Sequence, residues 1–287
     1  MTSNATPRLR WTAGRFDLDL TRPRVMGIVN ITPDSFSDGG LYLRPRPALD
    51  HCRELVDEGA DLLDLGAEST RPGAAPVSAQ EEWRRLLPVL AGAVLLGVPV
   101  SVDTSKPEVM QLALEHGADI VNDVRALRAP GAIEVVSTHP RCGVCLMHMR
   151  GEPATMQADP RYDDVVAEVR GFLAQRVSAA GEAGIGPERI VVDPGFGFGK
   201  TVDHNLELLR SLPRLQGLGA GVMSGWSRKS SLAKITGREP DDPAERVAAS
   251  VAAALASVQR GARIVRVHDV AATVDAVRVW QRAGLVD

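Results

Sequence analysis

Residues 189–200 read RIVVDPGFGFGK. The run from Arg189 to Val192 is short and apolar, as expected for a buried strand, and Asp193 follows it directly. The glycines that alternate after Pro194 allow the backbone to approach a ligand closely. Alone, this pattern is typical of either a binding site at a strand end or a tight turn between a strand and a helix. Its recurrence along the chain favours the binding site.

The same order recurs: a short apolar run, a polar residue, then a segment with helical spacing. Continuous apolar runs are typical of parallel strands that are covered on both faces, and about eight such strands close a barrel. We therefore predict a (β/α)8 TIM barrel, because the alternative, an open doubly wound sheet, leaves some units without a place. The predicted strands are residues 25–29, 62–65, 98–102, 120–121, 143–147, 190–192, 221–223 and 264–267.

The segments between these runs predict helices, several of which begin near Pro or end at Gly. Residues 9–20 alternate around Ala13-Gly14, which predicts an N-terminal β-hairpin that covers the barrel bottom. We expect residues 1–287 to form a single domain, with a hairpin extension (1–23) and a barrel (24–284). The predicted helices are residues 47–58, 79–95, 107–116, 162–183, 205–212, 243–260 and 270–283, with a shorter, less regular segment after residue 122.

Composition excludes several classes of protein. The 287 residues carry a formal net charge of -3, which offers no basic surface for nucleic acid. No run approaches the roughly 18 apolar residues of a membrane span, and the first residues lack an apolar signal core. The three cysteines are too few for a disulfide framework, which indicates reduced thiols and a cytoplasmic protein.

Cys142 and Cys145 form a C-x-x-C pair, which can indicate a metal or redox site. The strand-like sequence around Val144, and the lack of a second Cys/His pair with zinc spacing, favour two buried thiols instead.

Polar residues stand after nearly every predicted strand, where a parallel barrel carries its chemistry. Asp and Asn side chains suit the paired N–H groups of a flat, nitrogen-rich ring, whereas Arg and His suit phosphate oxygens. An Asn can also contribute to a Mg²⁺ site that screens such an anion. These residues are Asn30, Glu68 to Arg71, Asp103, Asn122, Asp123, His148, Asp193, Ser227 to Lys229, Arg266 and His268.

Two segments without periodicity, residues 32–40 and 69–76, are predicted to be loops that close over this site. The chain contains no G-x-x-x-x-G-K-[ST], G-x-S-x-G or H-E-x-x-H motif. The predicted site therefore positions and polarises ligands without a protein nucleophile.

Eight motifs together resemble the dihydropteroate synthase family, in the family's order and over about residues 25–270. They are MGIVNITPDSFSDGG from Met26, GAESTRPGA from Gly66, VDTSKPEV from Val102, ADIVNDV from Ala118, MHMRGEPATMQ from Met147, DPGFGFGK from Asp193, SRKS from Ser227 and RVHDV from Arg266. The resemblance implies a (β/α)8 barrel and a folate-pathway transferase. Such an enzyme joins 6-hydroxymethyl-7,8-dihydropterin diphosphate to 4-aminobenzoate and releases diphosphate and 7,8-dihydropteroate. The resemblance further implies Mg²⁺ dependence, a homodimer, and sensitivity to sulfonamides.

Matching the family position by position implies a role for each site residue. The pterin would be bound by Asp103, Asn122, Asp193, Lys229 and Met147. The metal position is Asn30, and the diphosphate would be contacted by Asn30, Thr70, Arg71, Arg266 and His268. The 4-aminobenzoate pocket would contain Phe36, Thr70, Pro72, Phe198 and Ser227. The residues expected to act in catalysis are Asp103, Arg71, Lys229 and Asp193. The chain departs from the family pattern at Ala67, Ala233 and Trp226. These departures predict a change in ligand affinity rather than a loss of activity.

The family chemistry is thought to break the carbon–oxygen bond before the amine attacks, which requires negative charge near the pterin and positive charge near the leaving group. Two other functions use a similar barrel. One is methyl transfer from methyltetrahydrofolate to a corrinoid protein, which does not need the residue pairs Thr70-Arg71 and Arg266-His268. The other is a non-enzymatic paralogue, which would lose its loop motifs first, whereas this chain retains both.

Overall fold

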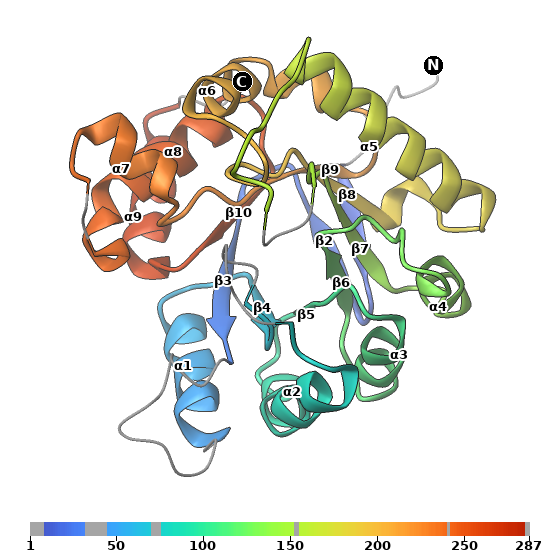
Figure 1. The fold of residues 1–287 in the computed structure, drawn as a ribbon. Helices are drawn as coiled ribbons and strands as arrows, with labels where there is room; N and C mark the ends of the chain where they lie inside the picture. The colour runs from blue at the N-terminus through green and yellow to red at the C-terminus, as the bar shows by residue number, and fades with distance from the viewer. Residues whose placement is uncertain (1–8, 32–44, 70–75, 152–154, 240–241, 285–287) are drawn as a thin grey trace, which may run out of the picture.

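The computed structural model describes residues 9–31, 45–69, 76–151, 155–239 and 242–284. Within them, eight parallel strands close into a barrel in the order β10-β3-β4-β5-β6-β7-β8-β9, and helices surround it (Figure 1). This closed sheet confirms the predicted (β/α)8 barrel and excludes the open doubly wound alternative. The C-terminal ends of all eight strands consequently face the same side.

Most strands extend a residue or two beyond the predicted apolar runs. Asn30, Asp103 and Asp193 are therefore the last residues of their strands. The backbone hydrogen bonds of the barrel fix the positions of their Cα atoms. The strands are β3 (Arg24–Asn30), β4 (Leu62–Gly66), β5 (Val100–Asp103), β6 (Ile120–Asp123), β7 (Gly143–Met147), β8 (Ile190–Asp193), β9 (Gly221–Ser224) and β10 (Ile264–Val267).

The helices lie close to their predicted positions, with two differences. The helix predicted at 243–260 begins with a 3-10 turn, η4 (Pro243–Arg246), and α7 (Ser230–Thr236) was not predicted, because a single short helix shows too little periodicity. The other helices are α1 (Pro45–Asp57), α2 (Ala79–Ala93), α3 (Pro107–Glu115), α4 (Ala132–Thr138), α5 (Val165–Glu182), α6 (Val202–Arg210), α8 (Val247–Gln259) and α9 (Val270–Arg282). None of those in the described ranges is long and apolar enough to cross a membrane.

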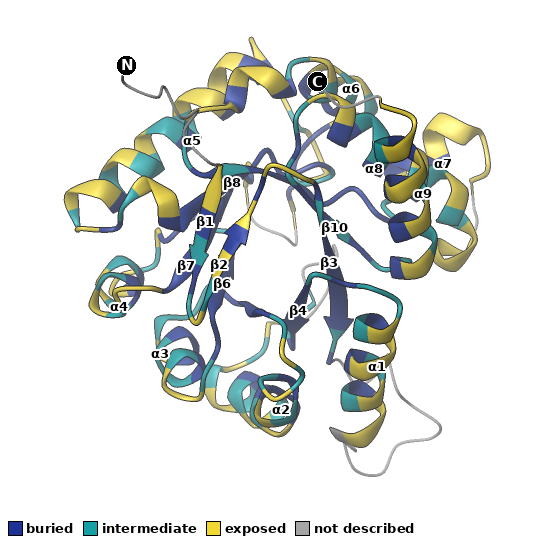
Figure 2. Ribbon diagram, turned by 180° about the vertical axis from the view of Figure 1, so that it is seen from behind, coloured by how far each residue is buried: buried dark blue, intermediate teal, exposed yellow. Residues whose placement is uncertain are grey.

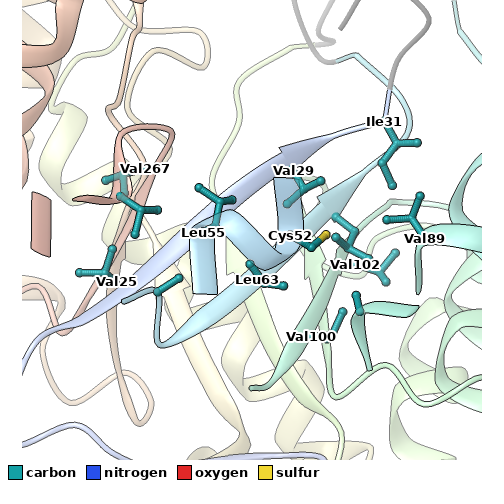
Figure 3. Packing of buried hydrophobic residues seen from close by; sticks show 14 of the residues in the cluster. Val25, Val29, Ile31, Cys52, Leu55, Leu63, Val89, Val100, Val102 and Val267 are labelled. Atoms are coloured by element: carbon teal, nitrogen blue, oxygen red, sulfur yellow. The ribbon is translucent and has the colours of Figure 1, made fainter. Parts of the chain in front are cut away.

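Alternate side chains of each strand face two different cores. Val25 and Val29 of β3 point outward and pack against Cys52 and Leu55 of α1 (Figure 3). Met26, between them in sequence, instead belongs to the cluster that fills the barrel interior. The continuous apolar runs of the sequence thus reflect strands that are buried on both faces.

The N-terminal hairpin, β1 (Arg10–Ala13) and β2 (Phe16–Asp19), lies across the end of the barrel opposite the C-terminal strand ends (Figure 2). Trp11 is 0% exposed, joins the interior cluster, and donates a hydrogen bond from Nε1 to the Arg189 carbonyl at 2.9 Å. The predicted covering of the barrel bottom is confirmed. Trp11 thereby closes this end of the barrel interior.

The two cysteines of the C-x-x-C pair lie in different hydrophobic clusters. Cys142 packs in the outer cluster with Val144 and Leu146, whereas Cys145 points into the barrel interior. Both are free and buried, and burial raises the pKa of Cys142 to about 12. The prediction of two buried structural thiols is therefore correct.

Candidate active site

A cleft opens at the C-terminal ends of the strands, as the sequence predicted. Side chains from most of the barrel strands and from the loops that follow them line it. The predicted residues that the cleft brings together are Asn30, Asp103, Asn122, Met147, Asp193, Phe198, Ser227, Lys229, Arg266 and His268. The predicted residues Phe36, Thr70, Arg71 and Pro72 lie outside the described residues.

Arg266 crosses the floor of this cleft between two carboxylates. Its Nε donates to Asp64 Oδ2 at 2.6 Å, and its terminal nitrogen donates to Asp103 Oδ2 at 2.9 Å. Asn122 Nδ2 donates to the same Asp64 oxygen at 3.0 Å. Three residues expected to bind substrate are thus held by one buried network.

Asp64, which holds two of the predicted site residues, Asn122 and Arg266, was not predicted from the sequence. It lies inside a run that was assigned as apolar strand, residues 62–65, and it is 0% exposed. The signal was present, since a lone carboxylate inside a buried strand requires a partner. Its other oxygen, Oδ1, has no hydrogen-bond partner among the described residues.

Burial sets the ionisation of the cleft carboxylates. It raises the pKa of Asp103 to about 7, although Arg266 opposes the shift, and Asp64 adds to it. Burial also raises the pKa of Asp193. A ligand that donates N–H groups to these oxygens would replace lost hydration and favour their charged forms.

Asp193 and Lys229 also line the cleft. Asp193 Oδ1 accepts a hydrogen bond from the Gly195 amide at 2.6 Å, which fixes the carboxylate at the start of the glycine-rich segment. Lys229 Nζ donates to the Phe196 carbonyl and lies 4.3 Å from the centre of the Phe198 ring. Burial lowers the pKa of Lys229 to about 7, and Asp193 opposes that shift.

Ser227 and His268 meet in the lining of the cleft. Ser227 Oγ lies 3.1 Å from His268 Nδ1 and accepts a hydrogen bond from the His268 amide at 3.2 Å. Together with Arg266, they give the cleft donors that suit an anion. The neighbouring Arg228 faces Asp269, at 2.5 Å, and so is already neutralised.

A second ionic cluster anchors both ends of the segment that contains Thr70 to Pro72. Lys106 Nζ donates to Glu68 at 2.7 Å and to Glu82 at 2.5 Å. Glu68 in turn accepts a hydrogen bond from the Val77 amide at 2.8 Å. The described residues on either side of this loop are therefore tied to the start of α3.

Two polar strand-end residues do not line the cleft. Asp123 accepts hydrogen bonds from the Arg125 and Leu127 amides, and it stabilises the turn in which Leu127 has a φ of 55°. His148 is 6% exposed and faces Lys200. Trp226, expected to reshape the aminobenzoate pocket, is 3% exposed, and its ring stacks on Phe196 with centroids 4.7 Å apart. These three residues support the site from behind it.

The residues of the cleft fit a metal ion only sparsely. In the parts of the chain that the structure describes, no group of three or more His, Cys, Asp or Glu side chains could hold one. Asn30, in the cleft lining, offers an amide oxygen. Mg²⁺ commonly takes one or two protein ligands and completes its shell with substrate phosphates and water, so this sparse set fits a Mg²⁺ that arrives with a diphosphate.

Comparison with known proteins gives this geometry its chemical class. Residues 26–268 match the family described as pterin binding enzyme. The barrel, with carboxylates and an amide converging on one side of its cleft, is therefore that of a pterin-binding enzyme.

Individual relatives are more specific. Dihydropteroate synthase of Neisseria meningitidis serogroup B is 53% identical over 280 residues, which cover 96% of this chain and 98% of that protein. The structure of Xanthomonas albilineans dihydropteroate synthase with 4-aminobenzoic acid has a TM-score of 0.90 and 53% identity and covers 98% of this chain and 100% of that one. The same enzyme in complex with 7,8-dihydropteroate gives a TM-score of 0.87 and 50% identity, with 97% and 100% covered. The chain belongs to the dihydropteroate synthase family.

Proposed function

We propose that this protein is a transferase that condenses 6-hydroxymethyl-7,8-dihydropterin diphosphate with 4-aminobenzoate to form 7,8-dihydropteroate and diphosphate. The observation that carries the proposal is that one cleft combines carboxylates with donors for an anion. Asp103 and Asp193 supply negative charge, and Arg266, which is bonded to Asp103, and His268 supply the donors. The solved relatives from Xanthomonas albilineans hold 4-aminobenzoic acid and 7,8-dihydropteroate.

The pterin half of the substrate is assigned to Asp103, Asn122, Asp193, Lys229 and Met147. Carboxylates accept paired N–H bonds from the ring, and Asn122 can both donate and accept. Met147 packs with Val124, Met149 and Met156 in a small apolar cluster that also contacts Phe198. Such a surface can cover a flat ring while the polar atoms orient it.

The diphosphate half is assigned to Asn30, Thr70, Arg71, Arg266 and His268, with Mg²⁺ held by the substrate and Asn30. When bound, Mg²⁺ would neutralise charge on the leaving diphosphate. Arg266 supports both halves, because the two carboxylates that hold it orient its guanidinium at the floor between them.

The proposed reaction is dissociative. The carbon–oxygen bond breaks, and its electron pair leaves with the diphosphate. Asp103 and Asp193 stabilise the positive charge that develops on the pterin. The lone pair of the 4-aminobenzoate amine then forms the new carbon–nitrogen bond, and the amine loses a proton. Since the incoming amine is the nucleophile, no protein nucleophile is needed.

The 4-aminobenzoate pocket is assigned to Phe36, Thr70, Pro72, Phe198 and Ser227. Phe198 supplies an apolar wall, and Ser227 supplies a hydroxyl beside His268. A sulfonamide that mimics 4-aminobenzoate would compete for this pocket, so we expect inhibition that rising 4-aminobenzoate relieves.

The test is diphosphate release by purified protein with the dihydropterin diphosphate and Mg²⁺, with and without 4-aminobenzoate. We expect turnover that depends on 4-aminobenzoate, forms dihydropteroate, and is lost in Arg71→Ala and in Asp103→Ala. Pterin binding without turnover would reject the transferase and favour the non-enzymatic paralogue.

We further propose that the protein acts in the cytoplasm as a homodimer. The three buried free thiols, Cys52, Cys142 and Cys145, support a reducing compartment. The dimer rests on membership of the family. Light scattering during size-exclusion chromatography measures it directly, and a monomer mass at assay concentrations would reject it.

A further inference from the structure

Lys200 is a buried lysine that the proposed reaction does not use. It ends the glycine-rich segment, is 3% exposed, and does not belong to the cleft lining. Burial lowers its pKa well below the usual range, and Asp193 only partly opposes that shift. A lysine is costly to bury, so its retention requires compensating contacts.

Four acceptors surround the Lys200 Nζ. It lies 3.0 Å from each of the Gly195 and Phe198 carbonyls, 3.3 Å from the His148 carbonyl, and 3.0 Å from His148 Nδ1. Burial, with the positive Lys200 beside it, lowers the pKa of His148 to about 2, so His148 is neutral and Nδ1 can accept a hydrogen bond from the ammonium. One ammonium thus joins the segment after β8 to the end of β7.

Side chains, rather than regular secondary structure, hold the whole glycine-rich segment. Its successive carbonyls, Gly195 to Gly199, all accept hydrogen bonds from side-chain donors. Two are bound by Lys200, and the others are bound by Lys229, Gln157 and Tyr162. The backbone needs this support because Gly195, Gly197 and Gly199 have φ values of 69°, 77° and 61°. Removing Lys200 would take the side-chain donor from two carbonyls at once, and the Gly195 carbonyl would keep only the hydrogen bond from the Phe198 amide at 3.1 Å.

The Phe198 ring is the part of the cleft wall that this support positions. It belongs to the cleft lining, contacts the Met147 cluster, and lies against Lys229. The residue that carries this ring also carries the carbonyl that accepts a hydrogen bond from Lys200. That hydrogen bond restricts the position of the backbone from which the Phe198 ring projects.

We propose that Lys200 is a positioning residue for the 4-aminobenzoate side of the cleft, acting through Phe198. This inference rests on the proposed function. Lys200 makes no contact with substrate in this role, because it lies behind the cleft wall. It acts by holding the backbone of the glycine-rich segment against the end of β7.

The test compares Lys200→Met, which removes all donors at similar length, with Lys200→Gln, which retains two. The control is Lys234→Met, an exposed lysine on α7. We expect Lys200→Met to raise the KM for 4-aminobenzoate about tenfold to a hundredfold, with a change below about threefold for the dihydropterin diphosphate. Lys200→Gln should lie between Lys200→Met and the unaltered protein, and the control should match the latter.

A double-mutant cycle separates this role from a general structural one. In a Phe198→Ala background, Lys200→Met should add little to the KM for 4-aminobenzoate, because both changes disable the same wall. The proposal would be overturned if the two substitutions multiplied their effects on the KM for 4-aminobenzoate. It would also be overturned if Lys200→Met changed the KM values of both substrates equally, or left the kinetic constants unchanged. Failure of both Lys200 variants to fold would also overturn it, by assigning the residue to stability alone.

Amide hydrogen exchange tests the inference without turnover. Residues 195–199 should exchange faster in Lys200→Met than in Lys234→Met, while α9 exchanges alike in both. If the unaltered protein shows no turnover, the proposed function fails. Slow exchange in Lys200→Met would instead reject the positioning role itself.

Discussion

Asp64 Oδ2 accepts the Arg266 Nε hydrogen bond at 2.6 Å although the two residues lie 202 positions apart in the chain. Asp64 is fully buried, and the side chain of Arg266 is 19% exposed, so the pair joins the barrel interior to the cleft floor. The carboxylate therefore determines where the guanidinium can present its remaining donors.

Replacing Asp64 should reduce catalysis without removing the fold. Asp64→Asn can still accept from Arg266 and Asn122, but it removes the charge, so we expect kcat/KM for the dihydropterin diphosphate to fall about tenfold to a hundredfold. Asp64→Ala removes both hydrogen bonds and should lose more. Steady-state kinetics would measure the effect, with Asp275→Asn as control, since Asp275 is 79% exposed in a 3.8 Å ion pair. An Asp64→Asn enzyme with unaltered kinetics would refute the assignment.

Pterin binding should depend on pH through Asp103, which faces Arg266, Asp64, Glu82 and Asp123. Its pKa is raised to about 7, so the carboxyl is protonated below that pH and charged above it. Ring N–H donors prefer the charged form, so affinity should weaken as pH falls below about 7, and binding there should release protons. Calorimetry in buffers of different ionisation enthalpy measures this release, and Asp103→Asn should abolish it. Affinity that rises on acidification would mean that the protonated carboxyl is the form that binds the pterin.

Gly195 should tolerate no side chain. A Cβ at this position would lie 2.0 Å from the His148 carbonyl oxygen, and its φ is 69°. Gly195→Ala should therefore displace the glycine-rich segment and weaken pterin binding about tenfold or more, because Asp193 is fixed by the Gly195 amide. Gly217→Ala is the matched control, since φ there is 81° and nothing lies within 4 Å of a Cβ. Equal pterin binding by the two variants would show that the clash with the His148 carbonyl does not disturb the site.

The barrel could be predicted from the sequence because strands that are buried on both faces have continuous apolar runs. Most of the cleft residues were also predictable, because they follow those runs and parallel strands bring their ends together, although Asp123 and His148 fit the same pattern without lining the cleft. Asp64 and Lys200 were missed for a common reason. Their roles depend on partners from distant strands and loops, Arg266 and His148, which only the assembled barrel register brings into contact.

Asn30 should set the Mg²⁺ requirement. With Asn30→Ala, one ligand oxygen is lost, and we expect the Mg²⁺ concentration for half-maximal turnover to rise about tenfold. Asn30→Asp supplies a charged oxygen in the same place, so that concentration should fall instead. Titrating Mg²⁺ at saturating substrates gives both values. An identical Mg²⁺ dependence in all three proteins would remove Asn30 from the metal site.

The hairpin should contribute stability rather than catalysis. Asp119 is 1% exposed and accepts hydrogen bonds from the Arg15 and Val100 amides, each at 3.0 Å, and from the Arg15 guanidinium. Asp119→Ala leaves both amides without that acceptor, which should lower the free energy of unfolding by about 2–3 kcal/mol. The half-exposed Arg15 adds little to this loss, because water solvates it when its partner is removed.

Urea unfolding followed by two probes measures this change, and Asp17→Ala in the same hairpin is the control, because its ion pair with Arg141 is solvent-exposed. The cleft lies at the opposite end of the barrel, so kcat/KM of folded Asp119→Ala should stay within about twofold of the unaltered enzyme. A large loss of kcat/KM at full folding would mean that the hairpin communicates with the cleft through the barrel interior, and the separation of a stabilising end from a catalytic end would then be wrong.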